Sequence, residues 1–359
     1  MTKFIPGVEL SRHYWHDVVR PIVDAVLPGT PRAGGLLGQG SDVLGFDTER
    51  STDHGWGPRV IVFVDDDTNV SEERRRDLAA AIDERLPETF DGFSTRFAAQ
   101  TGAQVQHQVS FTTVGAWFTA VLGFDPRDEV TATDWLATPS QLLRSSVAGA
   151  VFEDDAGLLT EARDRLRWYP HDVWLYLLGC QWRRIDQEEP FVGRTGEVGD
   201  ELGSSVVAAR LVRDLMRLCF LIERQYAPYA KWMGTAFSRL RCASALMPLF
   251  QSALGASDWK QREAALVPAI EEVARAFNDL AVAEPQDPTV RYFFNRPFLV
   301  LDSARFVEAC MAKTPLAQLG YVGGIDQFVD STDVLSRPPT AQRLRNFIAG
   351  AENWPTSSP

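Results

Sequence analysis

A glycine-serine pair, an acid and an apolar run form the part of the sequence best suited to chemistry. Gly40 and Ser41 precede Asp53, the twelfth residue after the serine, and the apolar run 60–64 follows. A glycine-rich turn lets backbone N–H groups come close to an anion, because no Cβ stands in the way. A carboxylate on a rigid strand can hold a divalent metal beside that anion. The stretch therefore indicates a place where a phosphate group meets a metal ion.

This spacing resembles the nucleotidyltransferase superfamily, whose members share a fold with DNA polymerase beta and the antibiotic nucleotidyltransferases. The superfamily signature is Gly-Ser or Gly-Gly and then, after a short interval, Asp-x-Asp or Asp-x-Glu on a strand. Gly40, Ser41 and Asp53 match this signature, but Gly55 stands where the second acid belongs. The resemblance implies that Gly40 and Ser41 bind the phosphates of ATP or another nucleoside triphosphate. It also implies that Asp53 is the remaining ligand for Mg²⁺.

A second candidate region lies between residues 187 and 232. Its first part, 187–203, combines glycines with acids, and we expect a loop that a ligand can approach closely. The segments YPHDVWLYLLGCQWRRIDQEEPFVGRTGEVGDELGS and AARLVRDLMRLCFLIERQYAPYAKW are similar to an uncharacterised bacterial family of domains of unknown function. By resemblance to two-domain antibiotic nucleotidyltransferases, Glu189 or Glu188 is the general base and Lys231 touches the triphosphate. The further candidate binding residues are Arg194, Arg217 and Tyr229.

Three functions fit these residues. The first is Mg²⁺-dependent transfer of a nucleoside monophosphate to a hydroxyl of a small acceptor. The second is metal-free acid/base chemistry, such as dehydration, cyclisation or addition, on a scaffold that has lost its metal site; Asp53, His54, Glu188 and Glu189 would supply the acid and base groups. The third is nucleotide or metabolite binding without catalysis. Because Gly55 removes an acid, we favour the second function slightly, and whether the protein is an enzyme stays open.

Two kinds of element must position these residues. Helical periodicity at 9–26, interrupted by Pro21, and at 71–86 alternates with expected strands at 52–64 and 105–114. Further helical patterns cover 139–151, 156–168, 171–187, 204–225, 229–253, 258–281 and 300–313. We therefore expect an α+β protein, in which a small nucleotidyltransferase-like mixed-sheet domain, residues 1–135, precedes a mostly helical domain, residues 136–359. A cleft between the two domains would bring the candidate residues together.

Composition excludes several classes of partner. The net charge of −12 argues against a general nucleic-acid binder, which needs a basic surface. The four cysteines lie far apart without a C-x-x-C pair, so neither a zinc site nor a disulfide framework is indicated. No apolar run approaches the roughly 20 residues of a membrane helix, and the N-terminus lacks a secretory apolar region. We expect a cytoplasmic protein with a small-molecule substrate, and no pattern indicates its oligomeric state.

Overall fold

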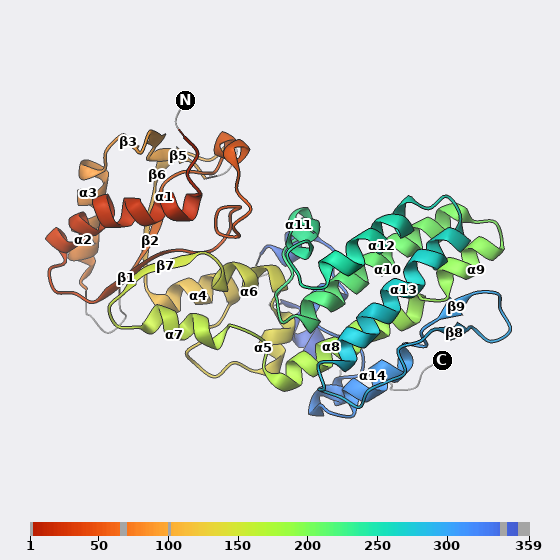
Figure 1. The fold of residues 1–359 in the computed structure, drawn as a ribbon. Helices are drawn as coiled ribbons and strands as arrows, with labels where there is room; N and C mark the ends of the chain where they lie inside the picture. Colours follow the sequence, from red (N-terminus) through yellow and green to blue (C-terminus); the bar gives the residue numbers. More distant parts are fainter. Residues whose placement is uncertain (1–2, 65–69, 100–101, 338–342, 351–359) are drawn as a thin grey trace. The chain divides into compact units, whose positions relative to one another are not determined.

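The computed structural model describes residues 3–64, 70–99, 102–337 and 343–350, and the structural statements below concern these residues. The chain divides into two compact units, which are drawn in Figure 1. The first unit combines Met1–Val130 with Leu142–Arg167, and the second combines Thr131–Gln141 with Trp168–Pro359. The single boundary expected after residue 135 differs from this division, because the segment that follows Gln141 returns to the first unit.

The first unit is built on a mixed five-stranded sheet. In spatial order its strands are β5 (Arg96–Ala98), β6 (Val105–Thr112), β2 (Arg59–Val64), β1 (Arg32–Leu36) and β7 (Ala150–Asp154). β2 runs parallel to β6, and all other neighbouring strands are antiparallel. The predicted mixed sheet is confirmed. The stretch that carries the glycine-serine pair is the connection between β1 and β2.

Helices cover both faces of β2. The helices of this part of the chain are α1 (Gly7–Tyr14), α2 (Arg20–Val26), α3 (Glu72–Arg85), α4 (Val114–Leu122), α6 (Ser140–Val147) and α7 (Leu158–Arg165), and a small hairpin joins β3 (Thr89–Phe90) to β4 (Phe93–Ser94). Val60, Val62 and Val64 share a core with side chains of α1, α2 and α3. Phe63 meets the Trp117 ring of α4 edge-on, with 6.2 Å between ring centroids. Burial on both faces explains why this strand is a continuous apolar run.

The N-terminal helix is interrupted before Pro21, as the sequence predicts. A π-helical turn, Trp15–Val19, separates α1 from α2. Proline lacks an N–H for the helical ladder and its ring crowds the preceding turn, and a π turn is one way to absorb that break. The Trp15 ring lies directly on β1, where a Cβ on Gly34 would come within 2.6 Å of it. Glycine is therefore needed at this close contact.

Three expectations about the strands are wrong. The strand expected at 52–64 begins only at Arg59, and Glu49–Asp53 form a 3-10 turn instead. β1 lies where no strand was expected, and β7 lies where the helix expected at 139–151 was to end. Both strands are short and have weak sequence patterns. Their extended conformation depends on pairing with each other and with β2.

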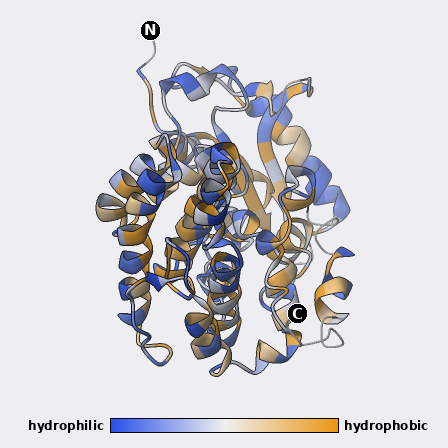
Figure 2. Ribbon diagram, turned by 90° about the vertical axis from the view of Figure 1, so that its right-hand side faces the viewer, coloured by the Kyte–Doolittle hydropathy of each residue, from blue (hydrophilic) through white to orange (hydrophobic). Residues whose placement is uncertain are grey.

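The second unit is helical, and the two units together confirm the α+β fold class. Its elements are α5 (Ala132–Ala137), α8 (His171–Glu188), α9 (Phe191–Glu197), α10 (Glu201–Ile222), α11 (Met233–Phe237), α12 (Ala243–Gly255), α13 (Trp259–Asn278), β8 (Arg291–Tyr292), β9 (Leu299–Val300), α14 (Ala304–Met311), α15 (Thr332–Leu335) and α17 (Arg345–Ala349). α8 packs against α10 and α14, and α10 also packs against α9, α12 and α13. Figure 2 shows hydrophobic and hydrophilic residues interleaved along the helices, as expected when each helix buries one stripe. Among the described helices, none is long and apolar enough to cross a membrane.

The glycine-rich segment 187–203 is not the loop that the sequence predicts. α9 occupies its middle, and α10 begins before its end. A Cβ on Gly193 would collide with the Phe298 ring, and a Cβ on Gly196 would collide with Trp259. These two glycines allow close packing of α9 against its neighbours, so their spacing reflects packing rather than approach of a ligand.

Candidate functional site

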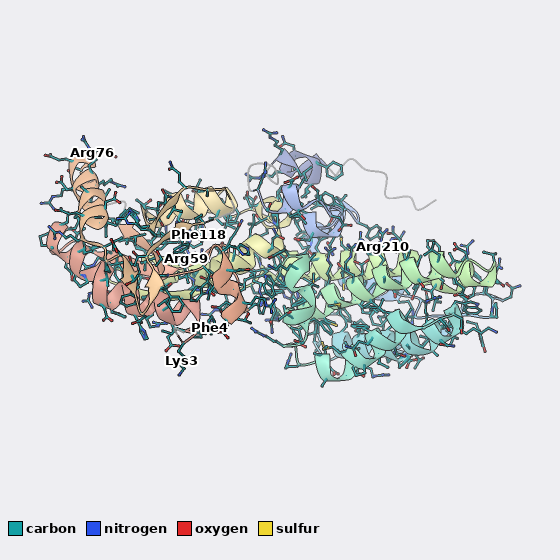
Figure 3. All side chains as sticks on the ribbon, turned by 90° about the horizontal axis from the view of Figure 1, so that it is seen from above. Lys3, Phe4, Arg59, Arg76, Phe118 and Arg210 are labelled. Carbon is teal, nitrogen blue, oxygen red and sulfur yellow. The ribbon has the colours of Figure 1, made fainter. Side chains whose placement is uncertain are left out.

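The glycine-serine turn of the first unit is built around one buried ion pair. Asp42, only 2% exposed, accepts hydrogen bonds from the Arg59 guanidinium at 3.0 Å (Nε) and 2.5 Å (Nη2). Arg59 Nη2 also donates to the Gln39 carbonyl at 3.0 Å, and Figure 3 shows this arginine in the first unit. A Cβ on Gly40, whose φ is +146°, would collide with that guanidinium. Gly40 is therefore a structural requirement of the turn, and Ser41 beside it is partly exposed.

A contact at Gly7 holds the two halves of the motif together. The Gly7 N–H and the Trp56 indole N–H both donate to Asp47 Oδ2, at 2.7 and 3.0 Å. A Cβ on Gly7 would lie 2.6 Å from the Asp42 Cβ and 2.9 Å from the Trp56 indole nitrogen. Since Asp42 directly follows Ser41, and Trp56 follows the acid of the motif by three residues, the turn and the acid lie in one neighbourhood of the first unit.

Asp53 and His54 form an exposed hydrogen-bonded pair. Asp53 ends the 3-10 turn, and its Oδ1 lies 2.7 Å from His54 Nδ1. The two side chains are 62% and 69% exposed. Both residues were expected within the strand 52–64, but neither lies in β2. A carboxylate on Nδ1 orients the imidazole and leaves Nε2 for a substrate.

The described residues of this motif do not fit a two-metal clamp. Gly55 has φ of +61°, and a Cβ there would lie 2.9 Å from the Ala99 carbonyl oxygen, so the backbone itself favours glycine where the signature has an acid. Asp42 is engaged by an arginine, and Asp47 by two N–H groups. Among the described residues, no three His, Cys, Asp or Glu side chains form a metal-binding group. Asp65, another candidate ligand, lies outside the described residues.

In the second unit, Glu189 supports the backbone that leads into α14. Its carboxylate accepts hydrogen bonds from the Leu301 and Ser303 N–H groups, both at 2.9 Å, and from the Ser303 hydroxyl at 3.2 Å. Burial raises the pKa of the Glu189 carboxyl to about 7, although these donors favour the charged form. All three contacts hold the chain in place, and the role of Glu189 as a general base stays a prediction.

The other candidates of the second unit do not converge on one place. Glu188 pairs with Arg210 of α10 at 3.0 Å, and Figure 3 labels Arg210. Burial raises the pKa of Glu188, and Arg210 opposes that rise. At the other end of α8, the Trp174 indole donates to the Leu221 carbonyl at 2.8 Å, at the end of α10 from which the chain continues to Lys231. Those two ends of α8 are about 20 Å apart at the helical rise of about 1.5 Å per residue.

The remaining two candidates, together with Lys231, are exposed. Arg194 lies over the Phe191 ring at 5.7 Å, and Lys231 lies over the Trp232 ring at 5.0 Å. Tyr229 is 38% exposed. Cations above aromatic rings of their own segment gain a modest stabilisation without a ligand. Their binding roles, and the cleft expected to unite both units, stay predictions.

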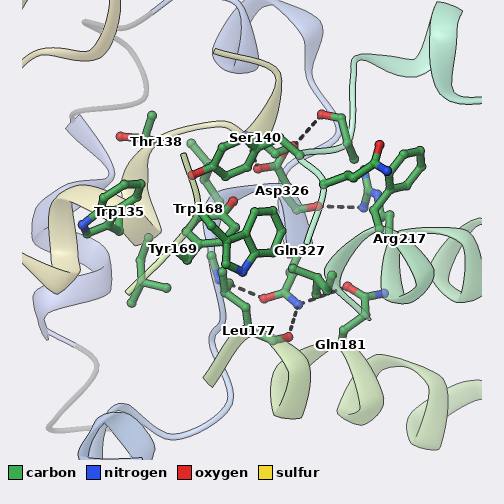
Figure 4. Close-up of a pocket in the computed structure, with 18 residues that line it drawn as sticks. Trp135, Thr138, Ser140, Trp168, Tyr169, Leu177, Gln181, Arg217, Asp326 and Gln327 are labelled. Atoms are coloured by element: carbon green, nitrogen blue, oxygen red, sulfur yellow. Dashed lines mark hydrogen bonds between the residues drawn. The ribbon is translucent and has the colours of Figure 1, made fainter. Parts of the chain in front are cut away.

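A small cavity inside the second unit contains Arg217 (Figure 4). It has a volume of about 50 Å³, enough for a few water molecules. Arg217 Nη1 donates to the Asp326 carbonyl at 2.7 Å. The Asp326 carboxylate accepts from the Ser140 N–H at 2.8 Å and from the Ser140 hydroxyl at 3.2 Å. Burial raises the pKa of Asp326, while Arg217 opposes that rise.

Aromatic rings form part of that cavity wall. Trp168, Tyr169 and Tyr226 lie in mutual contact, with ring centroids 4.9 to 5.0 Å apart. The Trp168 indole N–H is buried and has no hydrogen-bond partner among the described residues. Sequence reasoning missed Asp326 and these rings, because the acid lies 109 positions from Arg217 and no local spacing links them. The adjacent Trp168-Tyr169 pair was the only local signal.

Comparisons with known proteins bear on part of the chain. Residues 135–233 match the family model DUF4037, described as a domain of unknown function, which agrees with the expected resemblance to such a family over this stretch. Among solved structures, a nucleotidyltransferase-like protein from Exiguobacterium sibiricum 255-15 is 12% identical, and the match covers 74% of this chain and 77% of that one with a TM-score of 0.30. No curated protein matches. The nucleotidyltransferase-like interpretation of the first unit therefore depends on its own motif and mixed sheet.

Proposed function

We propose that this protein acts on a small, anionic molecule by metal-free acid/base chemistry at Asp53 and His54. The geometry of the Asp53-His54-Gly55 segment carries the proposal. A 2.7 Å hydrogen bond joins the acid to the imidazole, and the third position has a left-handed backbone that favours glycine over a second acid. The mixed sheet and the turn between β1 and β2 support a nucleotidyltransferase-like scaffold for this chemistry.

The arrangement of the pair suits proton transfer. When His54 Nδ1–H donates its hydrogen bond to the Asp53 carboxylate, Nε2 keeps a free lone pair and can take a proton from a substrate. The carboxylate then stabilises the imidazolium that forms. Dehydration, cyclisation and addition each need one proton to be removed and another to be delivered, which one imidazole can do in sequence.

The glycine-serine turn would bind the anionic group of the substrate. Glycine at position 40 brings the main chain close to its surroundings, and Arg59 places a guanidinium, 20% exposed, at the same turn. Its Nε and Nη2 donors are engaged by Asp42 and Gln39, so Arg59 would contribute positive charge close to the bound anion. The contact of Gly7 with Asp42 and Trp56 keeps this turn near the acid-imidazole pair.

A second candidate function is Mg²⁺-dependent nucleotidyl transfer from ATP or another nucleoside triphosphate. The spacing of Ser41 and Asp53, and the 62% exposure of the Asp53 side chain, favour it. In that case Asp53 would be the motif residue that holds the metal, and the metal would neutralise phosphate charge. Nucleotide binding without turnover is the third candidate. The cytoplasmic location belongs to the proposal as well.

Calorimetric titration with pyrophosphate and with ATP, each with and without Mg²⁺, distinguishes between these three candidate functions. We expect binding of pyrophosphate that Mg²⁺ changes little and that Ser41→Ala weakens. The Asp53→Asn and His54→Gln variants should bind pyrophosphate like the unmodified protein, with His16→Gln as an exposed histidine control. Binding of ATP that Mg²⁺ strengthens and Asp53→Asn abolishes would instead establish the transferase. A folded protein that binds neither probe would refute the anion site.

A further inference from the structure

The second unit contains a cavity of about 340 Å³ that no candidate function uses. Residues at the end of α10, at the start of α12 and at the end of α13 line it, and it is open on one side. The side chains that line it are Cys219, Ile222, Glu223, Arg241, Cys242, Leu246, Glu272, Val273, Ala276, Asp279 and Leu280. Its volume falls in the range of about 300–1,000 Å³ that is usual for small-molecule sites. Two of the four cysteines of the chain, Cys219 and Cys242, therefore line the same cavity.

Glu223 brings those two cysteines together. Its N–H donates to the Cys219 carbonyl at 2.9 Å, one turn back along α10. Its carboxylate accepts from the Cys242 N–H at 2.9 Å, and from the Arg241 N–H at 2.9 Å, just before α12 begins. Glu223 thus links Cys219 and Cys242, 23 positions apart in the sequence, and both residues line the same cavity.

The two thiols differ in access. Cys219 is 2% exposed, whereas Cys242 is partly exposed where it lines the cavity. The hydrogen bond to Cys242, together with burial, holds the pKa of the Cys219 thiol well above its usual range. A thiol reacts through its thiolate. Cys242 is therefore the thiol that a reagent in the cavity meets first.

The other two cysteines lack this setting. Cys180 and Cys310 are buried on α8 and α14, and neither lines any of the cavities described above. Burial raises the pKa of Cys180 to about 12, even though Tyr176 and Gly323 donate hydrogen bonds to it. Cys180 and Cys310 therefore serve as internal controls for cysteines that are buried but line neither of the cavities described above.

We propose that Cys219 and Cys242 form a thiol–disulfide exchange site that takes a low-molecular-weight disulfide from this cavity. The Cys242 thiolate attacks one sulfur of the disulfide, forms a mixed disulfide and releases one thiolate of the reagent. Cys219 then attacks the Cys242 sulfur, closes the Cys219–Cys242 bond and releases the second thiolate. The two thiol protons pass through solvent to the released thiolates. Overall two protein thiols are oxidised and one small disulfide is reduced to two thiols.

Peptide mapping of the full chain after exposure to 2-hydroxyethyl disulfide tests this site. We expect the number of titratable thiols to fall from four to two, and the tryptic peptides 218–224 and 242–260 to be joined. Peptides 168–183 and 306–313, which carry Cys180 and Cys310, should stay unmodified. In Cys219→Ser the mixed disulfide should accumulate on Cys242, and in Cys242→Ser Cys219 should stay a free thiol.

Three results would overturn the proposal. One is a folded protein that keeps four free thiols under these conditions. Another is oxidation of Cys180 and Cys310 at the same rate as the proposed pair, which would show general opening of the unit. The third is a mixed disulfide at Cys242 that persists in the unmodified protein, which would show that Cys219 cannot reach it. Circular dichroism before and after treatment establishes that the fold is intact in each case.

Discussion

Replacement of Glu189 by glutamine should remove a large pH dependence from the stability of this protein. The Glu189 carboxylate is buried at the end of α8 and accepts from Leu301 N–H, Ser303 N–H and the Ser303 hydroxyl. Glutamine keeps the size of the side chain but cannot ionise. Its amide NH₂ replaces one accepting oxygen, so at least one of the three donors loses its partner. That loss costs about 1–3 kcal/mol at every pH.

The pH-dependent part follows from the Glu189 pKa, which burial raises from 4.5 to about 7. Between pH 4.5 and 7, Glu189 keeps its proton in the folded protein but has lost it in the unfolded chain. The raised pKa of Glu189 therefore stabilises the folded protein fully below pH 4.5. This stabilisation is lost as the pH rises through 7. At about 1.4 kcal/mol per pH unit, the difference between the pKa values of the unfolded and folded states corresponds to about 3 kcal/mol of stability. The unmodified protein should lose this amount between pH 4.5 and 8, and Glu189→Gln should not.

Urea unfolding followed by tryptophan fluorescence, at intervals between pH 4.5 and 8, measures this difference. The decisive quantity is the change with pH in the stability difference between the two proteins, because the constant cost of the lost hydrogen bond cancels. Glu197→Gln, which removes an exposed carboxylate paired with Arg296 at 2.9 Å, is the control for loss of one charge. Parallel stability curves for the unmodified protein and Glu189→Gln would refute the reasoning.

Two further predictions concern the motif of the first unit. Gly55→Ala should lower the free energy of unfolding by about 2 kcal/mol, because φ is positive and a Cβ would meet the Ala99 carbonyl oxygen. The control Gly102→Ala, also at positive φ but with nothing within 4 Å, should lower it by about 1 kcal/mol. Equal losses of stability in urea unfolding would show that the contact at Gly55 is unimportant. Asp42→Asn should cost about 2 kcal/mol because it leaves Arg59 without its partner. The exposed control Asp53→Asn should unfold like the unmodified protein, and an Asp42→Asn variant as stable as that control would contradict the prediction.

The helices were largely predictable from the sequence. Apolar residues recur with helical periodicity over long segments such as 171–187, 204–225 and 258–281, and α8, α10 and α13 occupy these places within a few residues. A helix makes its hydrogen bonds within its own segment, so a local pattern is sufficient to predict it. The continuous apolar run of β2 is informative for a similar reason, since it reports burial on both faces.

The short strands and the glycine-rich segment were not predictable in this way. β1 and β7 bond to strands that are distant in the sequence, and their own residues have little strand character. The glycines of 187–203 look like loop residues until Phe298 and Trp259, both far along the chain, are seen packed against two of them. In each case the partner that decides the conformation is absent from the local sequence.

The sequence by itself determined the fold class, the helical second half, and the motif in which glycine stands in place of an acid. Only the tertiary structure decided what the individual side chains do. In the folded protein Asp53 forms a hydrogen bond with His54, and the Glu189 carboxylate accepts hydrogen bonds from the backbone that leads into α14. The tertiary structure also placed Cys219 and Cys242 in the wall of one cavity, linked through Glu223. The physical reason is that periodicity records which residues are buried, whereas hydrogen bonds and pKa values depend on neighbours that folding brings from elsewhere in the chain.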